Sequence, residues 1–138
     1  MSQENVEIVR RASAEFDETQ RLSESFAPDF ILDTRSFRDL PGQMEFHGPD
    51  GFFEFFEQWV DPYDEWDQEI EDVLDAGENQ VIAVFRQRGR LRGSTAWVEL
   101  RYGIVFAVED GLIRRVQIFG TPEEACEAAA LGESPTPP

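Results

Sequence analysis

The most regular pattern in the chain is the alternation of apolar and polar residues between positions 80 and 120. Three runs rich in Val, Ile, Phe and Tyr (80–91, 94–109 and 111–120) are separated by the short sequences Arg92-Gly93-Ser94 and Glu109-Asp110-Gly111. Runs of β-branched and aromatic residues bounded by Gly and Asp are typical of strands, and turns this short are typical of hairpins. The pattern predicts an antiparallel meander of three long strands, which must bury at least one face.

Helical spacing dominates the front of the chain and its C-terminal end. Residues 2–18 carry one apolar stripe at intervals of three and four, formed by Val6, Val9, Ala12 and Phe16. A short second helix is expected at 19–26. A third helix is expected to begin at Pro49 and to carry a broad aromatic face, and a terminal helix at 121–131 has Thr121 as its N-cap. Short strands are expected at 30–35 and 67–75, with a loop at 36–46.

Composition sets the class of the protein. The 138 residues, 41% of them apolar, are enough for one domain with a real core, which we place at 1–131. The sequence GESPTPP at 132–138 is expected to be a disordered tail. No apolar run is long enough to span a membrane, no signal peptide is evident, and a single cysteine suggests a reducing cytoplasm. The net charge of −17 argues against nucleic-acid and anionic-membrane partners.

The residue types that are absent exclude several chemistries. The chain has no lysine, so Schiff-base and P-loop mechanisms are ruled out, and His47 is the only histidine, so a His-rich zinc site is ruled out too. The acidic stretch 61–78 lacks the spacing of a calcium loop and is typical of a solvated face. We therefore expect neither a metal nor a cofactor.

Arginines at 86, 88, 90 and 92 occupy every second position and so share one face of their strand. Two interpretations are open. The side chains can form an ion-pair stripe against the acidic strand, each exposed pair contributing at most about 1 kcal/mol. Alternatively, one or two of them enter a cavity and bind an anion. Glu99 and Arg101, two residues apart on the next strand, also share a face.

Several strings carry a resemblance to a known family: ENVEIVRRA, APDFILDT, HGPDGFFEFFEQW, DAGENQVIAVFRQRGRLRGS and RYGIVFAVEDGLIRRVQIF. Together they resemble the SnoaL-like polyketide cyclases, within the nuclear transport factor two-like superfamily. The resemblance implies an α+β fold in which a cone-shaped, curved, mixed but mostly antiparallel sheet wraps around N-terminal helices, with a short C-terminal helix. It also implies a pocket at the open end of the cone and dimers formed through the outer sheet face. The superfamily includes isomerases, cyclases, dehydratases, hydrolases and binding proteins, so the fold alone gives no activity.

Aligning the chain with these relatives suggests site residues. The catalytic positions of ketosteroid isomerase fall on Thr34, Ala12 and Gly103, none of which can perform acid–base chemistry. The remaining catalytic candidates are Asp33, Glu99 and Arg101, with a carboxylate as base and an arginine stabilising negative charge. The alignment also predicts a concave face and pocket lined by Leu32, Thr34, Phe52, Phe56, Trp59, Val84, Arg86, Arg88, Trp97, Val105, Val116 and Ile118.

Two hypotheses of function follow. The first is an acid–base isomerase, cyclase or hydrolase acting on a small, partly apolar, oxygenated molecule. The second is a non-catalytic module that binds such a molecule or acts as a dimeric partner. The residues leave open whether the protein is an enzyme. In either case a small-molecule ligand is expected, and a homodimer is expected through an outer apolar face formed by Tyr102, Ile104, Phe106 and Phe119.

Overall fold

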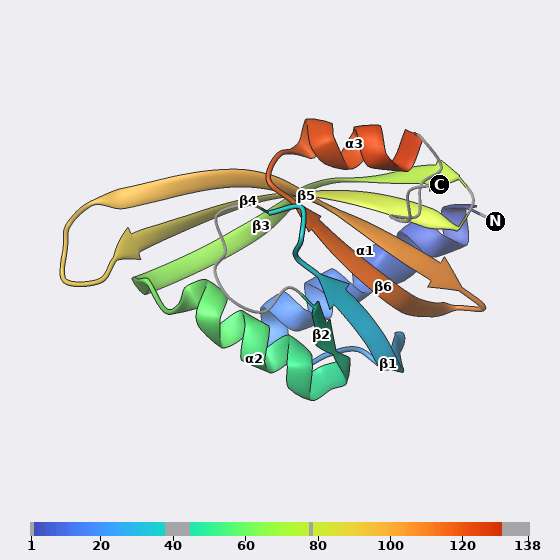
Figure 1. Cartoon of the computed structure of the whole chain (residues 1–138), viewed down its shortest axis with the longest axis horizontal. Helices are drawn as coiled ribbons and strands as arrows, with labels where there is room; N and C mark the ends of the chain where they lie inside the picture. The colour runs from blue at the N-terminus through green and yellow to red at the C-terminus, as the bar shows by residue number, and fades with distance from the viewer. Residues whose placement is uncertain (1, 38–44, 78, 131–138) are drawn as a thin grey trace.

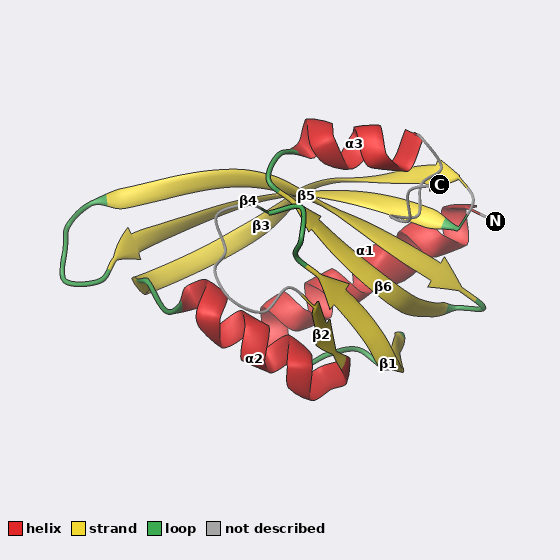
Figure 2. Cartoon of the chain, viewed as in Figure 1, coloured by secondary structure: helices red, strands yellow, loops and turns green. Residues whose placement is uncertain are grey.

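We analysed a computed structural model of the chain, in which residues 2–37, 45–77 and 79–130 are described. The described residues form three helices and six strands (Figures 1 and 2), in the order α1 (Ser2–Thr19), β1 (Phe26–Asp33), β2 (Glu45–His47), α2 (Gly48–Val60), β3 (Tyr63–Gly77), β4 (Gln80–Leu91), β5 (Trp97–Glu109), β6 (Leu112–Phe119) and α3 (Pro122–Ala130). The predicted tail at 132–138 lies outside the described residues.

The six strands form one mixed sheet in the order β2-β1-β6-β5-β4-β3. The contact between β1 and β6 is parallel, and the other four neighbouring pairs are antiparallel. Helices α1 and α2 lie on one face of the sheet and α3 lies on the other, while the β4–β5 hairpin projects beyond both α1 and α2 (Figure 1). The predicted α+β architecture and the predicted meander of three long strands are therefore confirmed.

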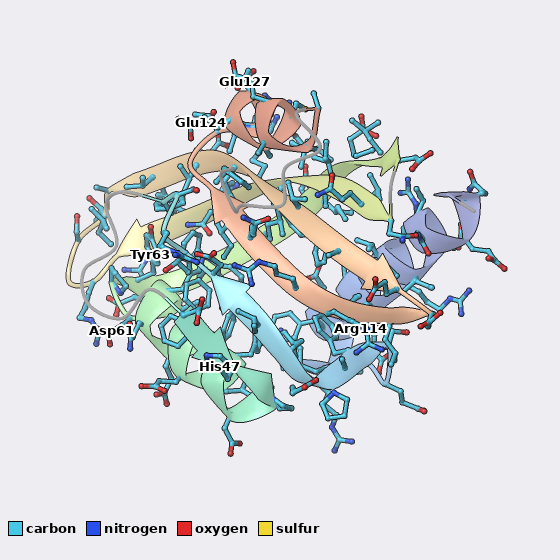
Figure 3. The ribbon with its side chains drawn as sticks, turned by 45° about the vertical axis from the view of Figure 1, so that its right-hand side comes forward. His47, Asp61, Tyr63, Arg114, Glu124 and Glu127 are labelled. Carbon is cyan, nitrogen blue, oxygen red and sulfur yellow. The ribbon has the colours of Figure 1, made fainter. Side chains whose placement is uncertain are left out.

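Two apolar clusters hold the layers together. The larger one joins the stripe of α1, which includes Val6 and Val9, to α2 and to the inner face of the sheet. The smaller one lies under α3, where Ala125 and Ala129 pack on Ile82, Val105 and Phe119. The Thr121 hydroxyl accepts a hydrogen bond from the backbone N–H of Glu124 at 3.1 Å, which confirms the predicted N-cap. Two of the exposed acids of α3, Glu124 and Glu127, are labelled in Figure 3.

The predicted second helix at 19–26 is wrong. Helix α1 ends at Thr19, and Gln20 adopts a left-handed φ of 59° while its backbone N–H donates to the Phe16 carbonyl. The following serines use local hydrogen bonds instead of helical ones: the Ser25 N–H donates to the Ser23 hydroxyl at 2.9 Å. The Ser25 carbonyl accepts from the Ile113 N–H of β6, so this segment enters the sheet early.

The strands of the front half are longer than the sequence suggested. Strand β1 begins at Phe26 rather than at 30, and a register irregularity between Phe26 and Ile31 accommodates Pro28 in a strand that contacts β6. The end of the predicted loop at 36–46 forms β2, whereas residues 38–44 lie outside the described part of the chain. Strand β3 spans 63–77 rather than 67–75.

Strand β3 is one edge of the sheet, and its acidic composition is explained by that position. An edge strand presents unpaired backbone groups that can recruit another strand, and charged side chains disfavour such pairing. The outward residues of β3 are acidic, and the structure pairs them with the arginine stripe: Glu71 contacts Arg86 at 2.8 Å, and Glu65 contacts Arg90 at 3.2 Å. The ion-pair interpretation is therefore confirmed for Arg86 and Arg90, whereas Arg92 pairs with Asp61, which precedes β3, and Arg88 lies over the ring of Trp97.

The apolar face assigned to a dimer interface is already buried within one chain. Tyr102, Ile104 and Phe106 face α1 and α2, and Phe119 lies under α3. All four are less than 9% exposed. Their proposed role between subunits is therefore wrong, because the chain itself supplies both covers. A homodimer stays a prediction, and it would have to use other residues.

Candidate functional site

The space between α1, α2 and the inner face of the sheet contains a cavity of about 90 Å³. Its lining is drawn from both helices and from strands β1, β3, β4, β5 and β6, and consists of Ala12, Ser13, Phe16, Leu22, Phe26, Leu32, Phe52, Phe55, Phe56, Trp59, Trp66, Gln68, Phe85, Tyr102, Ile104, Phe106, Val116 and Ile118. A cavity of roughly 150 Å³ admits benzene. The present cavity is smaller, so a single ring enters only if side chains of the lining move apart.

The wall of the cavity is a continuous set of aromatic contacts. Phe16 of α1 meets the α2 rings Phe52 and Phe56 edge-to-face, with centroids 5.3 and 5.1 Å apart. Phe56 continues the wall to Trp66 at 5.4 Å. Edge-to-face pairs add to the free energy of area burial and fix ring orientation, so the wall is preorganised for an apolar molecule.

A series of hydrogen bonds between polar side chains crosses this apolar wall. The Tyr102 hydroxyl donates to Gln68 Oε1 at 2.7 Å, and Gln68 Nε2 donates to Asp17 Oδ1 at 3.4 Å. Burial raises the pKa of Tyr102, and the charge of Asp17 raises it further, so the phenol stays protonated. Asp17 is an exposed residue, but partial desolvation of its carboxylate raises its pKa, and the hydrogen bond from Gln68 only partly offsets that effect.

The two tryptophans of the lining differ in their hydrogen bonding. Trp59 Nε1 donates to Gln87 Oε1 at 2.6 Å, and Gln87 Nε2 reaches the Tyr63 hydroxyl at 3.5 Å. Trp66 Nε1, by contrast, is buried without a hydrogen-bond partner among the described residues. An unpaired buried N–H costs about 1–3 kcal/mol. Trp66, a residue of the lining, therefore carries a buried donor that no described residue satisfies.

The structure brings only half of the predicted pocket together. Leu32, Phe52, Phe56, Trp59, Val116 and Ile118 line the cavity. The other six residues do not belong to the lining: Thr34, Val84, Arg86, Arg88, Trp97 and Val105. The errors on β4 and β5 share one cause. On these two strands the predicted inward positions are shifted by one residue from the observed ones, and a shift of one residue moves every side chain to the opposite face.

The predicted concave face of β4 and β5 is in fact the outer face. Val105 packs under α3, and the Arg88 guanidinium lies 4.7 Å from the ring centroid of Trp97, which is 47% exposed. The inner positions are the neighbours of those predicted: Phe85 on β4, and Tyr102, Ile104 and Phe106 on β5. One signal in the sequence could have settled this. A charged residue at every second position marks the face that water reaches.

The catalytic candidates lie outside the cavity. Glu99 and Arg101 are exposed on the outer face, where Arg101 Nε donates to Glu71 at 2.6 Å. That hydrogen bond is the main reason why the pKa of Glu71 is lowered, with the charges of Arg101 and Arg86 acting in the same direction. Gly103, the position of the isomerase donor, faces α3. Ala12 alone among the isomerase positions lines the cavity.

Asp33 is buried, on the face of β1 opposite to Leu32. It accepts hydrogen bonds from the side chain of Arg35 at 2.9 Å and from Arg115 Nη2 at 2.7 Å. Burial alone would raise the pKa of Asp33, but the hydrogen bonds and charges of Arg35 and Arg115 outweigh it and lower the pKa. A carboxylate held in this way is a poor base near neutral pH. Its environment is that of a structural ion pair.

Within the described residues, no group of three or more His, Cys, Asp or Glu side chains is arranged to hold a metal ion. None of the helices in that part of the chain is both long and apolar enough to cross a membrane.

Comparison with known proteins identifies the family of the chain. The family model for the SnoaL-like domain matches residues 9–116, which is most of the chain. The chain belongs to the SnoaL-like domain family. No curated protein matches the SnoaL-like chain in sequence.

Solved structures agree with the SnoaL-like fold. TerC, co-crystallised with polyporic acid, is 16% identical with a TM-score of 0.70, over 90% of this chain and 98% of that one. Bal32a, from a soil-derived mobile gene cassette, is 21% identical with a TM-score of 0.67, over 85% and 88%. An NTF2-like protein of unknown function from Burkholderia pseudomallei K96243 is 18% identical with a TM-score of 0.67, over 90% and 95%. At these identities the likeness concerns the fold alone.

Proposed function

We propose that this SnoaL-like protein binds a small, largely apolar, oxygenated molecule in the aromatic cavity. The observation that carries the proposal is the composition of the lining, where aromatic rings surround a very small number of polar groups: Tyr102, Gln68, Ser13 and the free N–H of Trp66. A mostly apolar pocket with a few placed polar groups is the usual form of a small-molecule site. Among the described residues the lining includes no arginine, so binding of an anion through the Arg86 stripe is not supported.

A second candidate, isomerase- or cyclase-type turnover of the bound molecule, is favoured by one observation. Asp17 is linked to the cavity by its hydrogen bond with Gln68, and its raised pKa brings it nearer to the range of a general base. Asp17 is not itself part of the lining, however, and the described lining residues contain no carboxylate, histidine or cysteine. Binding is therefore the better-supported function.

Filling the cavity should abolish binding without unfolding the protein. Ala12 is 3% exposed and lines the cavity, so Ala12→Leu adds three carbons to the space that a ligand would occupy. We expect the wild type to bind single-ring probes such as toluene and phenol with dissociation constants of about 1 mM or tighter. Ala12→Leu should weaken both by at least roughly tenfold, as measured by isothermal titration calorimetry.

The matched control is Ala14→Leu, which adds the same atoms at an exposed position of α1. It should leave both affinities unchanged. Filling a cavity commonly stabilises a protein, so the thermal midpoint of Ala12→Leu should not fall by much. Equal binding by the wild type and a folded Ala12→Leu variant would place the probe site elsewhere and contradict the proposal.

A further inference from the structure

The chain of hydrogen bonds from α1 to the cavity has a fixed direction. An ionised carboxylate can only accept hydrogen bonds, so Asp17 requires the NH₂ group of Gln68 to face it. The amide oxygen of Gln68 then faces Tyr102 and accepts the hydrogen bond from its hydroxyl, at a donor–acceptor distance of 2.7 Å. The orientation of the amide therefore follows from the charge at the far end of the chain.

This direction determines what Tyr102 can offer to a ligand. A tyrosine hydroxyl has one proton and two lone pairs. Because the proton is committed to Gln68, the remaining hydrogen-bonding capacity of Tyr102 Oη is that of an acceptor. Tyr102 is 4% exposed and lies in the cavity lining, so water cannot readily substitute for the missing partner of an unsuitable ligand.

We propose that the cavity selects molecules that present an O–H or N–H donor to Tyr102 Oη, and that Asp17 sets this preference through Gln68. The proposal rests on the proposed binding function and names its ligand class: alcohols, phenols, enols or amides of about one ring. A ketone or ether of the same size would place its lone pairs against those of Tyr102. Asp17 is in this sense a positioning residue and makes no contact with the ligand.

The donor of Trp66 complements this preference. Its buried Nε1 has no hydrogen-bond partner among the described residues, whereas the indole of Trp59 is already satisfied by Gln87. A hydroxyl group can donate to one neighbour and accept from another. A single hydroxyl on an apolar ring can therefore donate to Tyr102 Oη. The same hydroxyl can accept from Trp66 Nε1 if the ring places it within reach of both.

The direction of the hydrogen bond from Tyr102 to Gln68 also affects whether the cavity can stabilise an oxyanion. Stabilising an enolate or another oxyanion requires a donor aimed at the developing charge. Tyr102 donates its one hydrogen bond to Gln68, and burial keeps the hydroxyl from ionising, so in this arrangement it is not such a donor. The cavity therefore differs from a site in which a tyrosine donates a hydrogen bond to a substrate carbonyl and polarises it.

The test compares cyclohexanol with cyclohexanone, two rings of nearly equal size that differ in having a donor or only an acceptor. Titration calorimetry on the full-length wild type should show cyclohexanol binding about tenfold more tightly. In Tyr102→Phe, which removes only the hydroxyl, the two affinities should converge to within about threefold. In Asp17→Asn the Gln68 amide is free to reverse and present its NH₂ group to Tyr102, which frees the Tyr102 hydroxyl to donate to a ligand, so the preference should fall by a similar factor.

The control for Asp17 is Glu18→Gln, which removes one negative charge from the neighbouring exposed position of α1 and should keep the tenfold preference. Equal binding of the two rings by the wild type, or tighter binding of cyclohexanone, would overturn the inference while leaving the binding function in place. A preference that survives in Asp17→Asn would overturn the role of Asp17. Failure of the wild type to bind either ring, or toluene, would overturn the binding function itself.

Discussion

Replacing Asp33 with alanine should lower the free energy of unfolding by about 3 kcal/mol, a loss typical of a buried ion pair that is broken on one side. The carboxylate is 4% exposed and bridges Arg115 of β6, and it also accepts hydrogen bonds from the backbone N–H and the side chain of Arg35. Without it, Arg115, whose Nε already lacks a partner among the described residues, keeps a half-buried charge. Urea unfolding at pH 7 measures the change.

Two variants serve as controls for this prediction. Asp33→Asn keeps the volume and the acceptor for the Arg35 backbone N–H, so it should lose less than Asp33→Ala. Asp29→Ala removes an exposed carboxylate from the same strand and should change the free energy by no more than about 0.5 kcal/mol. A loss below about 1 kcal/mol in Asp33→Ala would show that the cluster does not stabilise the contact between β1 and β6.

Acid should remove the same contribution from the wild type. The pKa of Asp33 is lowered by folding, so its contribution is fully present above the ordinary aspartate pKa of about 3.9 and is lost as the pH falls through the folded value. The difference in unfolding free energy between the wild type and Asp33→Asn should therefore be constant from pH 7 to about 5 and should shrink below about pH 4. A difference that grows on acidification would contradict the sign of the pKa shift.

Gly103→Ala should lower the free energy of unfolding by about 2 kcal/mol, because it overpacks the contact between β5 and α3. A Cβ at this position would lie 2.7 Å from the Cβ of Ala125 and 3.1 Å from the Cα of Pro122. Both are rigid parts of α3, so the helix must move away from the sheet. The small apolar cluster that includes Ala129 would then be opened to water. Urea unfolding monitored by circular dichroism measures the loss.

A double-mutant cycle with Ala125→Gly identifies the cause. Ala125→Gly alone should cost about 1 kcal/mol of helix propensity, but it removes the atom nearest to the new methyl group. The loss of unfolding free energy in the double variant should therefore be about 1 kcal/mol smaller than the sum of the two single losses. As a control, Gly120→Ala meets its nearest atom at 3.6 Å and should be nearly neutral. Strict additivity of the two losses would rule out the proposed clash.

Local signals in the sequence predicted most of the elements. The Asp110-Gly111 turn adopts the positive φ values that its residues favour, 53° and 78°, and the hairpin forms there as expected. The stripe of α1 and the cap at Thr121 likewise follow from spacing and side-chain chemistry within a few residues. The helix expected at 19–26 failed for a local reason too, because Ser23 and Ser25 hydrogen-bond in a turn.

The sequence by itself determined the family, through the strings that resemble its members, and it determined the order of most elements and the aromatic face of α2, because such elements follow periods of two and 3.6 residues. The apolar pattern did not determine which face of β4 and β5 is concave, since both faces carry large apolar residues such as Val84 and Phe85. Only the arginines at every second position favoured one face as the outer one. That choice was made by tertiary packing: α3 covers one face, α1 and α2 cover the other, and β3 pairs its acids with the arginines. Only the folded chain brings Asp17, Gln68 and Tyr102, from α1, β3 and β5, into one line of hydrogen bonds.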